Sequence, residues 1–228
     1  MKIPILFEDN HLLVVEKPVN IPVQADQSND EDLLSLLKND IKIRYQKPGN
    51  VYLGLVHRLD RPVGGTMVFA KTSKAASRLS DVLRRKEMVR SYVAVVRGVP
   101  RKKQGTLEHY LWKDNRKNKV HVVTADHPDA KKAILTYEII SSTEDLSLLS
   151  IHLHTGRSHQ IRVQLATSGF PLYGDQKYGQ QVNRPGQQIA LWAYSLSFPH
   201  PTTKEINRFQ SEPPKEYPWN LWKHFQVK

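Results

Sequence analysis

The sequence HRLDRPVGGTMVFAKTSKAA, residues 57–76, decides the fold, because it places an aspartate and two adjacent glycines between two apolar segments. The run VYLGLV precedes it and MVFA lies inside it; both are short and rich in β-branched and aromatic residues, which is typical of buried strands. Asp60 is therefore expected on a strand-to-strand connection, between Arg58 and Arg61. Positive charge nearby favours the ionised form of a carboxylate, which suits a nucleophile or a base. A turn cap or a structural pair with one arginine is the alternative.

The composition favours a polyanionic partner. The chain has 228 residues, enough for one large domain or two small ones. Its 34 Lys and Arg against 22 Asp and Glu give a formal net charge of +12. An excess of this size favours binding to nucleic acid, although a solvated basic surface without a partner has the same composition.

The residue types also bear on compartment and targeting. The sequence contains no cysteine, which excludes disulfides and thiolate metal sites and fits a reducing compartment. The first residues, MKIPILFEDNHLLVVEKP, carry charges throughout and offer neither the apolar core nor the cleavage site of a signal peptide. No apolar run approaches the length of a membrane span. We therefore expect a cytoplasmic protein without a membrane segment.

The first part of the chain predicts a hairpin and two helices. Apolar runs at residues 3–7 and 12–15, separated by a polar turn, are typical of a β-hairpin. Leucines at helical spacing after Asp32 predict a short surface helix. Thr72, or the serine after it, is expected to cap a second helix that runs to about Lys86 and has an apolar face.

Strands dominate the rest of the chain. Apolar and alternating segments predict strands at RSYVAVVRG, TLEHYLW, KVHVVT, AILTYEII, LSLLSIHLH and QIALWAYSLSF, and Ser158 is expected to cap a third helix through about Thr167. Strands joined by short turns, with few helices, are typical of an α+β fold with a mixed, mainly antiparallel central sheet flanked by a few helices. Because no linker or composition break interrupts the chain, we expect a single domain over residues 1–228.

A second group of polar residues stands in LHTGRSHQIRVQLATSGFPLYGDQKYG, residues 153–179. Arg157, His159 and Arg162 crowd the start of the third predicted helix, where free backbone amides and the helix dipole favour an anion. The anion is either a phosphate or a carboxylate, and Asp60 is a candidate if the fold brings the two segments together. For Arg162 a plain surface position is an equally good interpretation.

Other residues also allow a structural and a functional interpretation. Tyr92 lies on an apolar strand, where it is either a core residue or a side chain that stacks on a base. The closely spaced His152, His154 and His159 raise the question of a metal. No Cys or acidic partner follows at a typical spacing, so we expect no metal site and interpret these imidazoles as packing or hydrogen-bonding groups.

Basic clusters alternate with aromatic residues in one segment. Tyr110 and Trp112 are interleaved with a run of cations, namely Lys113, Arg116, Lys117 and Lys119. This pattern suits a groove that tracks phosphates and holds unstacked bases, although a hairpin loop kept soluble by its charges looks similar. The glycines at 64 and 65 are not followed by a helix-opening phosphate motif, so no nucleotide cofactor is expected.

Taken together, these segments resemble the RluA-type pseudouridine synthases, a family that isomerises uridine in ribosomal or transfer RNA. FEDNHLLVVEKPVNIPVQ is similar to the family's opening hairpin, HRLDRPVGGTMVFAKTSKAA to its signature, and RSYVAVVRG to its second motif. LHTGRSHQIRVQLATSGFPLYGDQKYG is similar to the third motif and IALWAYSLSFPHPTTKE to the closing strand. The match covers nearly the whole chain in the family's order, and it implies the pseudouridine synthase fold.

The chain departs from the family pattern in three respects. Gln164 and Trp192 stand where the family often has His. Many relatives also carry a small RNA-binding module in front of the catalytic domain, whereas here the first motif starts at the first residue. RNA selection is therefore expected from the basic surface of the catalytic domain itself or from a partner.

The resemblance implies roles for named residues. Asp60 matches the catalytic aspartate, and Arg162 matches the arginine that pairs with it. Tyr92 matches the tyrosine that stacks on the target uracil and assists proton removal from carbon 5. Arg58 matches the residue that fills the gap left by the flipped-out nucleotide. Further contacts to the substrate are implied for His57, Arg157, His159 and Gln160.

The implied activity is isomerisation of specific uridines to pseudouridine in ribosomal or transfer RNA, by a protein expected to be a monomer. The reaction requires no redox change, phosphate transfer or metal, so no cofactor is expected. The alternative is a non-catalytic RNA-binding or ribosome-assembly protein on the same scaffold. A hydrolase that uses Asp60 with His159 is a third class, which needs a water-activating geometry.

Overall fold

The computed structural model describes residues 2–222, 225 and 227. The described chain forms two compact units, the first from Met1–Arg90 with Ala193–Glu212 and the second from Ser91–Trp192 with Pro213–Lys228. Strand pairing in both is mostly antiparallel, and three α-helices accompany the strands, so the expected α+β class with a mixed, mainly antiparallel sheet is confirmed. The single domain over residues 1–228 stays a prediction.

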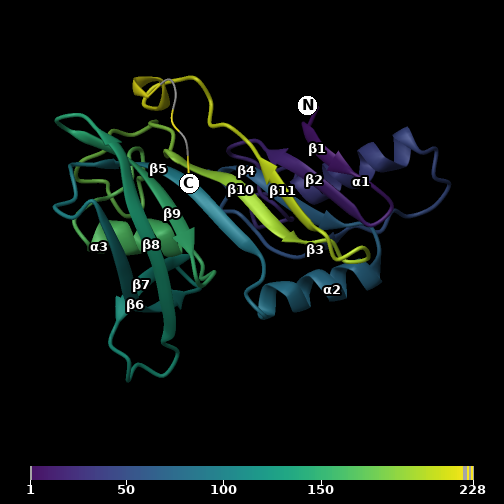
Figure 1. Cartoon of the computed structure of the whole chain (residues 1–228), viewed down its shortest axis with the longest axis horizontal. Coiled ribbons are helices and arrows are strands. Elements are labelled where there is room, and N and C mark those ends of the chain that lie inside the picture. The colour runs from purple at the N-terminus through teal and green to yellow at the C-terminus, as the bar shows by residue number, and fades with distance from the viewer. Residues whose placement is uncertain (1, 223–224, 226, 228) are drawn as a thin grey trace. The chain divides into compact units, whose positions relative to one another are not determined.

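The first unit is built on the strand order β1-β2-β4-β10, with β3 paired to β4 and β11 paired to β10 (Figure 1). The expected opening hairpin is confirmed, because β1 and β2 pair antiparallel and the Asp9 carboxylate accepts from the backbone amides of His11 and Leu12 in the turn. The strands are β1 (Ile5–Glu8), β2 (Leu12–Lys17), β3 (Gly54–Leu55), β4 (Gly64–Ala70), β10 (Leu191–Pro199, whose first two residues belong to the second unit) and β11 (Ile206–Gln210).

Two helices belong to this unit. Helix α1 (Leu33–Arg44) begins at Asp32, whose carboxylate accepts from the Ser35 amide. Helix α2 (Ser73–Arg84) begins at Thr72, whose hydroxyl accepts from the Ala75 amide, as expected. The apolar face of α2 packs on β2, β4 and β10 and completes a core formed by Leu12, Val14, Val68, Ala70, Ala75, Leu79, Val82, Met88, Leu196 and Phe198.

Gly65 is required where β4 passes β10. Its φ is +113°, and a Cβ on it would lie 2.3 Å from the carbonyl oxygen of Ala193. Only glycine tolerates both the left-handed backbone and the close approach. Strands β4 and β10 are therefore held at a distance that any side chain at position 65 would prevent.

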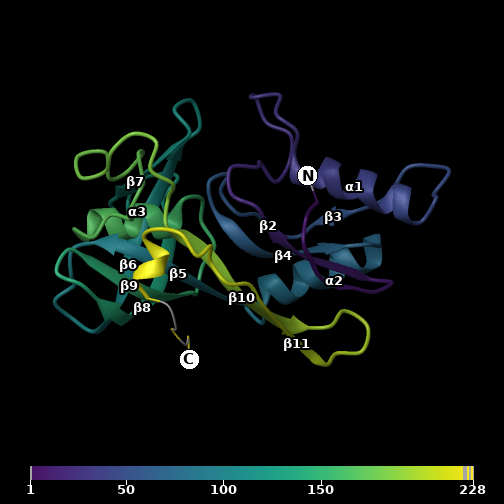
Figure 2. The ribbon, with the colours of Figure 1, turned by 90° about the horizontal axis from the view of Figure 1, so that it is seen from above.

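The second unit contains strands in the order β5-β9-β8-β6-β7, all paired antiparallel (Figure 2). Helix α3 packs against β6 and β7, where Val163 joins a small core with Leu111, Val120 and Ala133. The elements are β5 (Val89–Arg97, whose first two residues belong to the first unit), β6 (Gln104–Asp114), β7 (Lys119–Val123), β8 (Lys131–Ser142), β9 (Leu146–Leu153), α3 (Gln160–Thr167) and the 3-10 turn Trp219–Leu221.

The structure corrects the expected elements at three places. The apolar run at 51–56 forms only the two-residue strand β3, because the chain then turns into the Asp60 loop. Strand β11 was not predicted; its residues alternate between exposed and half-buried, which gives a weak apolar signal. Helix α3 begins after His159 and not after Ser158: His159 has a left-handed φ of +51° and makes no side-chain cap. No helix among the described residues is long and apolar enough to span a membrane.

Candidate active site

Asp60 opens a tight turn that leads into β4. The amide of Val63 donates a 3.0 Å hydrogen bond to the carbonyl oxygen of Asp60, and the side chain of Asp60 is half-buried. The residues before it alternate, because His57 and Leu59 are buried whereas Arg58 is exposed. The buried pair anchors the loop, and the exposed arginine is available to a ligand.

Lys17 fastens the Asp60 turn from inside the protein. It is fully buried at the end of β2, and its ammonium group donates to the carbonyl oxygens of Pro18, Arg61 and Val63 at 2.9, 3.0 and 2.8 Å. Burial lowers the pKa of Lys17 to about 7; the negative charge of Asp60 opposes this shift and Arg61 reinforces it. A buried ammonium group therefore holds two of the carbonyl groups in the turn that follows Asp60, those of Arg61 and Val63.

His57 is a second internal anchor of the loop. Its Nε2 accepts a 3.2 Å hydrogen bond from the amide of Val68 in β4, so the ring is neutral and carries its proton on Nδ1. Burial, with a smaller effect of Arg90, lowers the pKa of His57 to about 3. A buried acceptor of this kind acts through the loop backbone, whereas the family resemblance implied that His57 contacts the substrate; that contact stays a prediction.

Arg61 connects the Asp60 turn to the loop that precedes α1. Its guanidinium donates to the Asn20 carbonyl oxygen and the Ser28 hydroxyl, both at 3.1 Å, and forms an ion pair with Asp30. These contacts give the Arg61 side chain a structural role, because they fix the loop that precedes α1. The two arginines beside Asp60 consequently differ, because Arg58 is exposed and Arg61 braces a loop.

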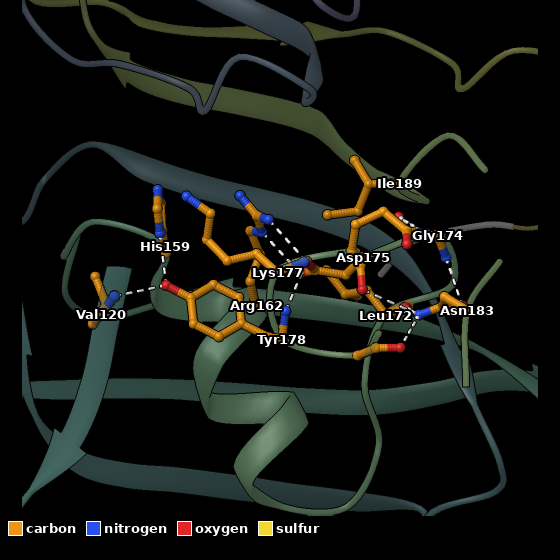
Figure 3. Close-up of polar contacts among 12 residues, drawn as sticks. Val120, His159, Arg162, Leu172, Gly174, Asp175, Lys177, Tyr178, Asn183 and Ile189 are labelled. Carbon is orange, nitrogen blue, oxygen red and sulfur yellow. Dashed lines mark hydrogen bonds and ion pairs between the residues drawn. The ribbon is translucent and has the colours of Figure 1, made fainter. Parts of the chain in front are cut away.

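In the second unit, Arg162 forms a buried, two-point ion pair with Asp175 (Figure 3). Arg162 Nε and Nη2 lie 2.8 and 2.9 Å from the two carboxylate oxygens of Asp175. Burial alone would raise the pKa of Asp175, but the hydrogen bonds from Arg162 and from two backbone amides hold it below its usual range. Paired geometry of this kind fixes the plane of the guanidinium.

Tyr178 joins the start of α3 to strand β7. Its hydroxyl accepts from the Val120 amide at 2.8 Å and lies 2.7 Å from His159 Nδ1 (Figure 3). The guanidinium of Arg162 lies over its ring, 5.3 Å from the centroid. Residues 157–162 therefore rest on the segment 172–179, as the two halves of one polar cluster.

Gln160 and Gln164 hold α3 against the strands. The Gln160 side chain accepts from the Thr155 hydroxyl and the Arg157 amide, and it donates to the Ile134 carbonyl oxygen at 3.1 Å. Gln164 donates to the carbonyl oxygens of Leu107 and Ala133, at 3.1 and 3.2 Å. Buried Gln160 thus shapes the loop that presents Arg157, and its expected contact with the substrate stays a prediction.

The structure distributes the expected site residues over the two units. Asp60, His57 and Arg58 belong to the first unit. The second unit holds Tyr92, which is buried on β5 opposite Ile151 of β9, together with Arg157, His159, Gln160 and Arg162. The expected pairing of Arg162 with Asp60 stays a prediction.

Three residues of these clusters were not predicted, namely Lys17, Asp175 and Tyr178. The lysine lacks a local signal, because it resembles any cation at the end of a strand. A signal did exist for Asp175, the one acidic residue between Asp145 and Glu205. A solitary carboxylate after three cationic or imidazole side chains in a buried segment is the natural partner for one of them.

The three histidines considered as metal ligands, His152, His154 and His159, make different contacts. His152 and His154 are in edge contact at 4.9 Å between ring centroids, whereas His159 contacts Tyr178. Among the described residues, no three side chains of metal-binding type are placed to hold one ion.

Comparisons with known proteins agree with this architecture. The sequence profile of the RNA pseudouridylate synthase family matches residues 11–167. The chain is 36% identical over 208 residues to the uncharacterized RNA pseudouridine synthase YhcT of Bacillus subtilis. The aligned segment covers 90% of this chain and 67% of YhcT. It is 32% identical over 231 residues to the ribosomal large subunit pseudouridine synthase D of Haemophilus influenzae, covering 93% and 68% of the two chains.

Among solved structures, human RNA pseudouridylate synthase domain containing 4 superposes with a TM-score of 0.80 at 23% identity, over 96% of this chain and 91% of that one. That likeness shows the pseudouridine synthase fold. The family profile spans both the Asp60 loop and the start of α3, and the curated relatives align along nearly the whole chain. The chain therefore belongs to the RluA family of RNA pseudouridine synthases, and it is an isomerase that acts on RNA.

Proposed function

We propose that this enzyme converts specific uridines in ribosomal or transfer RNA to pseudouridine, and that Asp60 is the catalytic carboxylate. The observation that carries this proposal is the attachment of the Asp60 turn. The ammonium group of Lys17 binds the carbonyl oxygens of Arg61 and Val63, which follow Asp60. His57, which precedes Asp60, is fastened to β4 by the hydrogen bond from the Val68 amide. The Asp60 side chain itself is half-buried. A carboxylate on a rigid loop that a ligand can still reach suits a reacting group.

The reaction rearranges one nucleotide without adding or removing atoms. The bond between N1 and the anomeric carbon breaks, the uracil turns, and carbon 5 bonds to the anomeric carbon in its place. The proton on carbon 5 then leaves, and N1 gains one. An Asp60 oxygen either adds to the anomeric carbon or removes the 2′ proton of the ribose, and both routes need a carboxylate at this position.

The other assigned residues support the nucleotide during these steps. The target base must leave its stack, which costs a few kcal/mol. We propose that Tyr92 stacks on the extruded uracil and that Arg58, exposed on the Asp60 loop, fills the gap in the RNA. Arg162 is proposed to act on the same nucleotide as Asp60, with its guanidinium plane held by Asp175.

The test of Asp60 is release of tritium from RNA labelled at carbon 5 of uridine. The variant Asp60→Asn keeps the shape of the side chain and removes its charge, so we expect release to fall by about 100- to 10,000-fold while RNA binding changes little. Glu31→Gln is the matched control, because Glu31 is an exposed carboxylate of the same unit. Full activity of Asp60→Asn would refute the catalytic assignment.

The RNA target is tested in cells. Ribosomal large subunit RNA is the substrate named for the Haemophilus influenzae relative, which supports ribosomal RNA as the first candidate. Pseudouridines are mapped in total RNA from a strain that lacks this protein and from the same strain carrying wild type or Asp60→Asn. We expect one or a few sites to be lost, and to return with wild type only.

A further inference from the structure

A basic cavity of about 810 Å³ opens between the β6–β7 hairpin, the start of β8 and the loop before α3. All of its lining residues belong to the second unit. Four cations line it, namely Lys113, Arg116, Lys131 and Arg157, and each is exposed. The proposed steps of the isomerisation do not use this cavity, although the sequence favours an anion contact at Arg157 and a phosphate-tracking groove at Lys113 and Arg116.

Strand register places these cations on one face of the sheet. Lys113 lies opposite Val120, and Lys131 lies opposite Leu111. Leu111 and Val120 pack against Val163 of α3. Because side chains alternate along a strand, Lys113 and Lys131 stand on the same side as α3, where the loop carrying Arg157 also begins.

Arg157 is held beside the start of β8. Its Nε donates to the carbonyl oxygen of Lys132 at 3.1 Å, which leaves the rest of the guanidinium exposed next to Lys131. The backbone of the same loop is fixed by Gln160, which accepts from the Arg157 amide at 3.0 Å. The cationic wall is therefore built from elements that are anchored independently of a ligand.

Two carboxylates also line the cavity. Asp114 accepts from the backbone amides of Arg116 and Lys117, at 2.9 and 3.1 Å, and so closes the hairpin loop. Asp129 is exposed at the rim. Four cations against two carboxylates leave an excess of two positive charges in a space too large for a single phosphate.

The lining of the cavity also includes the aromatic residue Trp112 of β6. Trp112 pairs with His121 across β6 and β7, and its ring lies 5.8 Å from the His121 ring and 5.2 Å from the His127 ring. Trp112, Lys113 and Arg116 therefore line one cavity, whereas the binding of phosphates and unstacked bases there stays a prediction. The cavity consequently offers mainly charge to a ligand, because its lining holds four cations and one aromatic residue.

We propose that this cavity binds the sugar–phosphate backbone of the RNA substrate at nucleotides other than the one that is isomerised. This inference rests on the proposed function, because it assumes that RNA is the ligand. Backbone phosphates meet the excess charge, and their repeat along a strand matches several separate cations better than a free phosphate does. Contacts of this kind add affinity and register without reading sequence.

Binding of a fluorescein-labelled single-stranded oligouridylate, followed by anisotropy at several salt concentrations, tests the cavity. Each phosphate contact to a single strand contributes about 0.7 to the slope of log affinity against log salt, so Lys113→Ala with Lys131→Ala should lower the slope by about 1.4. Lys113→Arg with Lys131→Arg should restore it. Lys42→Ala with Lys47→Ala removes the same charge from exposed positions in and after α1 and should leave the slope unchanged.

Three results would overturn the cavity as an RNA site. The first is an unchanged slope in the Lys113 and Lys131 double alanine variant when circular dichroism shows it folded. The second is an equal fall in the Lys42 and Lys47 control, since attraction would then be spread over the whole surface. The third is displacement of the labelled RNA by uridine monophosphate or inorganic phosphate as effectively as by unlabelled oligouridylate, which would indicate a site for small phosphates.

The proposed function is tested separately in the same preparations. One outcome is that wild type releases no tritium from labelled RNA while the double alanine variant still lowers the salt slope as expected. The proposed isomerisation of that RNA would then be wrong, and the cavity would remain an RNA-binding site. With labelled RNA as substrate, the double alanine variant should raise KM and leave kcat within about twofold, because phosphate contacts bind ground state and transition state alike.

Discussion

The ammonium group of Lys17 donates a 2.8 Å hydrogen bond to the carbonyl oxygen of Val63, although 46 residues separate them in the chain. The contact closes the turn that begins at Asp60, because the same ammonium also binds the carbonyl oxygen of Arg61. The buried ammonium group thus replaces the backbone hydrogen bonds that a helix or a sheet would supply to this loop. It pairs peptide groups that would otherwise be buried without a partner.

Lys17→Met should weaken both the fold and the reaction. It removes three hydrogen bonds while keeping an unbranched side chain one atom shorter than lysine, and a buried carbonyl left unpaired costs about 1–3 kcal/mol. We expect the free energy of unfolding to fall by that amount in urea titrations. Tritium release should fall mainly through kcat, since the Asp60 turn loses its support. Lys42→Met, at an exposed position of α1, is the control and should change neither.

His57 should make the protein sensitive to acid. The folded-state pKa of about 3 lies below the ordinary value of 6.5, so the unfolded chain binds more protons between these values. The contribution of neutral His57 to the free energy of unfolding is therefore fully present above pH 6.5 and is lost as pH falls toward 3. His57→Gln keeps an acceptor for the Val68 amide but cannot titrate, and urea midpoints measured across this range should fall less steeply than in wild type. Parallel curves would show that other groups cause the acid loss.

Asp175→Asn should leave the buried guanidinium of Arg162 without its negatively charged partner. Both side chains are buried, and removing one partner of a buried ion pair costs about 3–5 kcal/mol. Thermal and urea unfolding should show this loss, and tritium release should fall with it because the guanidinium is no longer held in plane. Asp145→Asn, an exposed turn residue at the end of β8, should leave both quantities unchanged.

Gly65→Ala should destabilise the first unit. A φ of +113° is strained for alanine, at a cost of about 1–3 kcal/mol, and the new Cβ would also meet the backbone of Ala193. The free energy of unfolding should therefore fall by more than the strain alone. Gly49→Ala is the control, because a Cβ there meets nothing within 4 Å. Equal stability of the two variants would contradict the close approach of β4 and β10.

Local pattern accounts for the elements that were predicted well. The apolar runs of β5 and β9, the leucines of α1 and the Thr72 cap of α2 depend on residues close together in the chain, and the predicted strands, helix and cap all appear in the structure. Strand β11 and the start of α3 were missed or misplaced for the opposite reason. Half-exposed edge residues give a weak signal, and the left-handed turn at His159 replaces a side-chain cap by a hydrogen bond from the Arg157 amide to Gln160.

The sequence by itself determined which residue types are available and the order of their motifs. That was sufficient for the fold class, for the family and for the expectation that Asp60 stands on a loop. The tertiary structure alone decided which groups meet. Lys17 reaches the Asp60 turn because the register of β2 against β4 sets it opposite Gly65, and Arg162 meets Asp175 because the loop after α3 folds back on the helix. Such contacts depend on register and chain reversal, which no local pattern encodes.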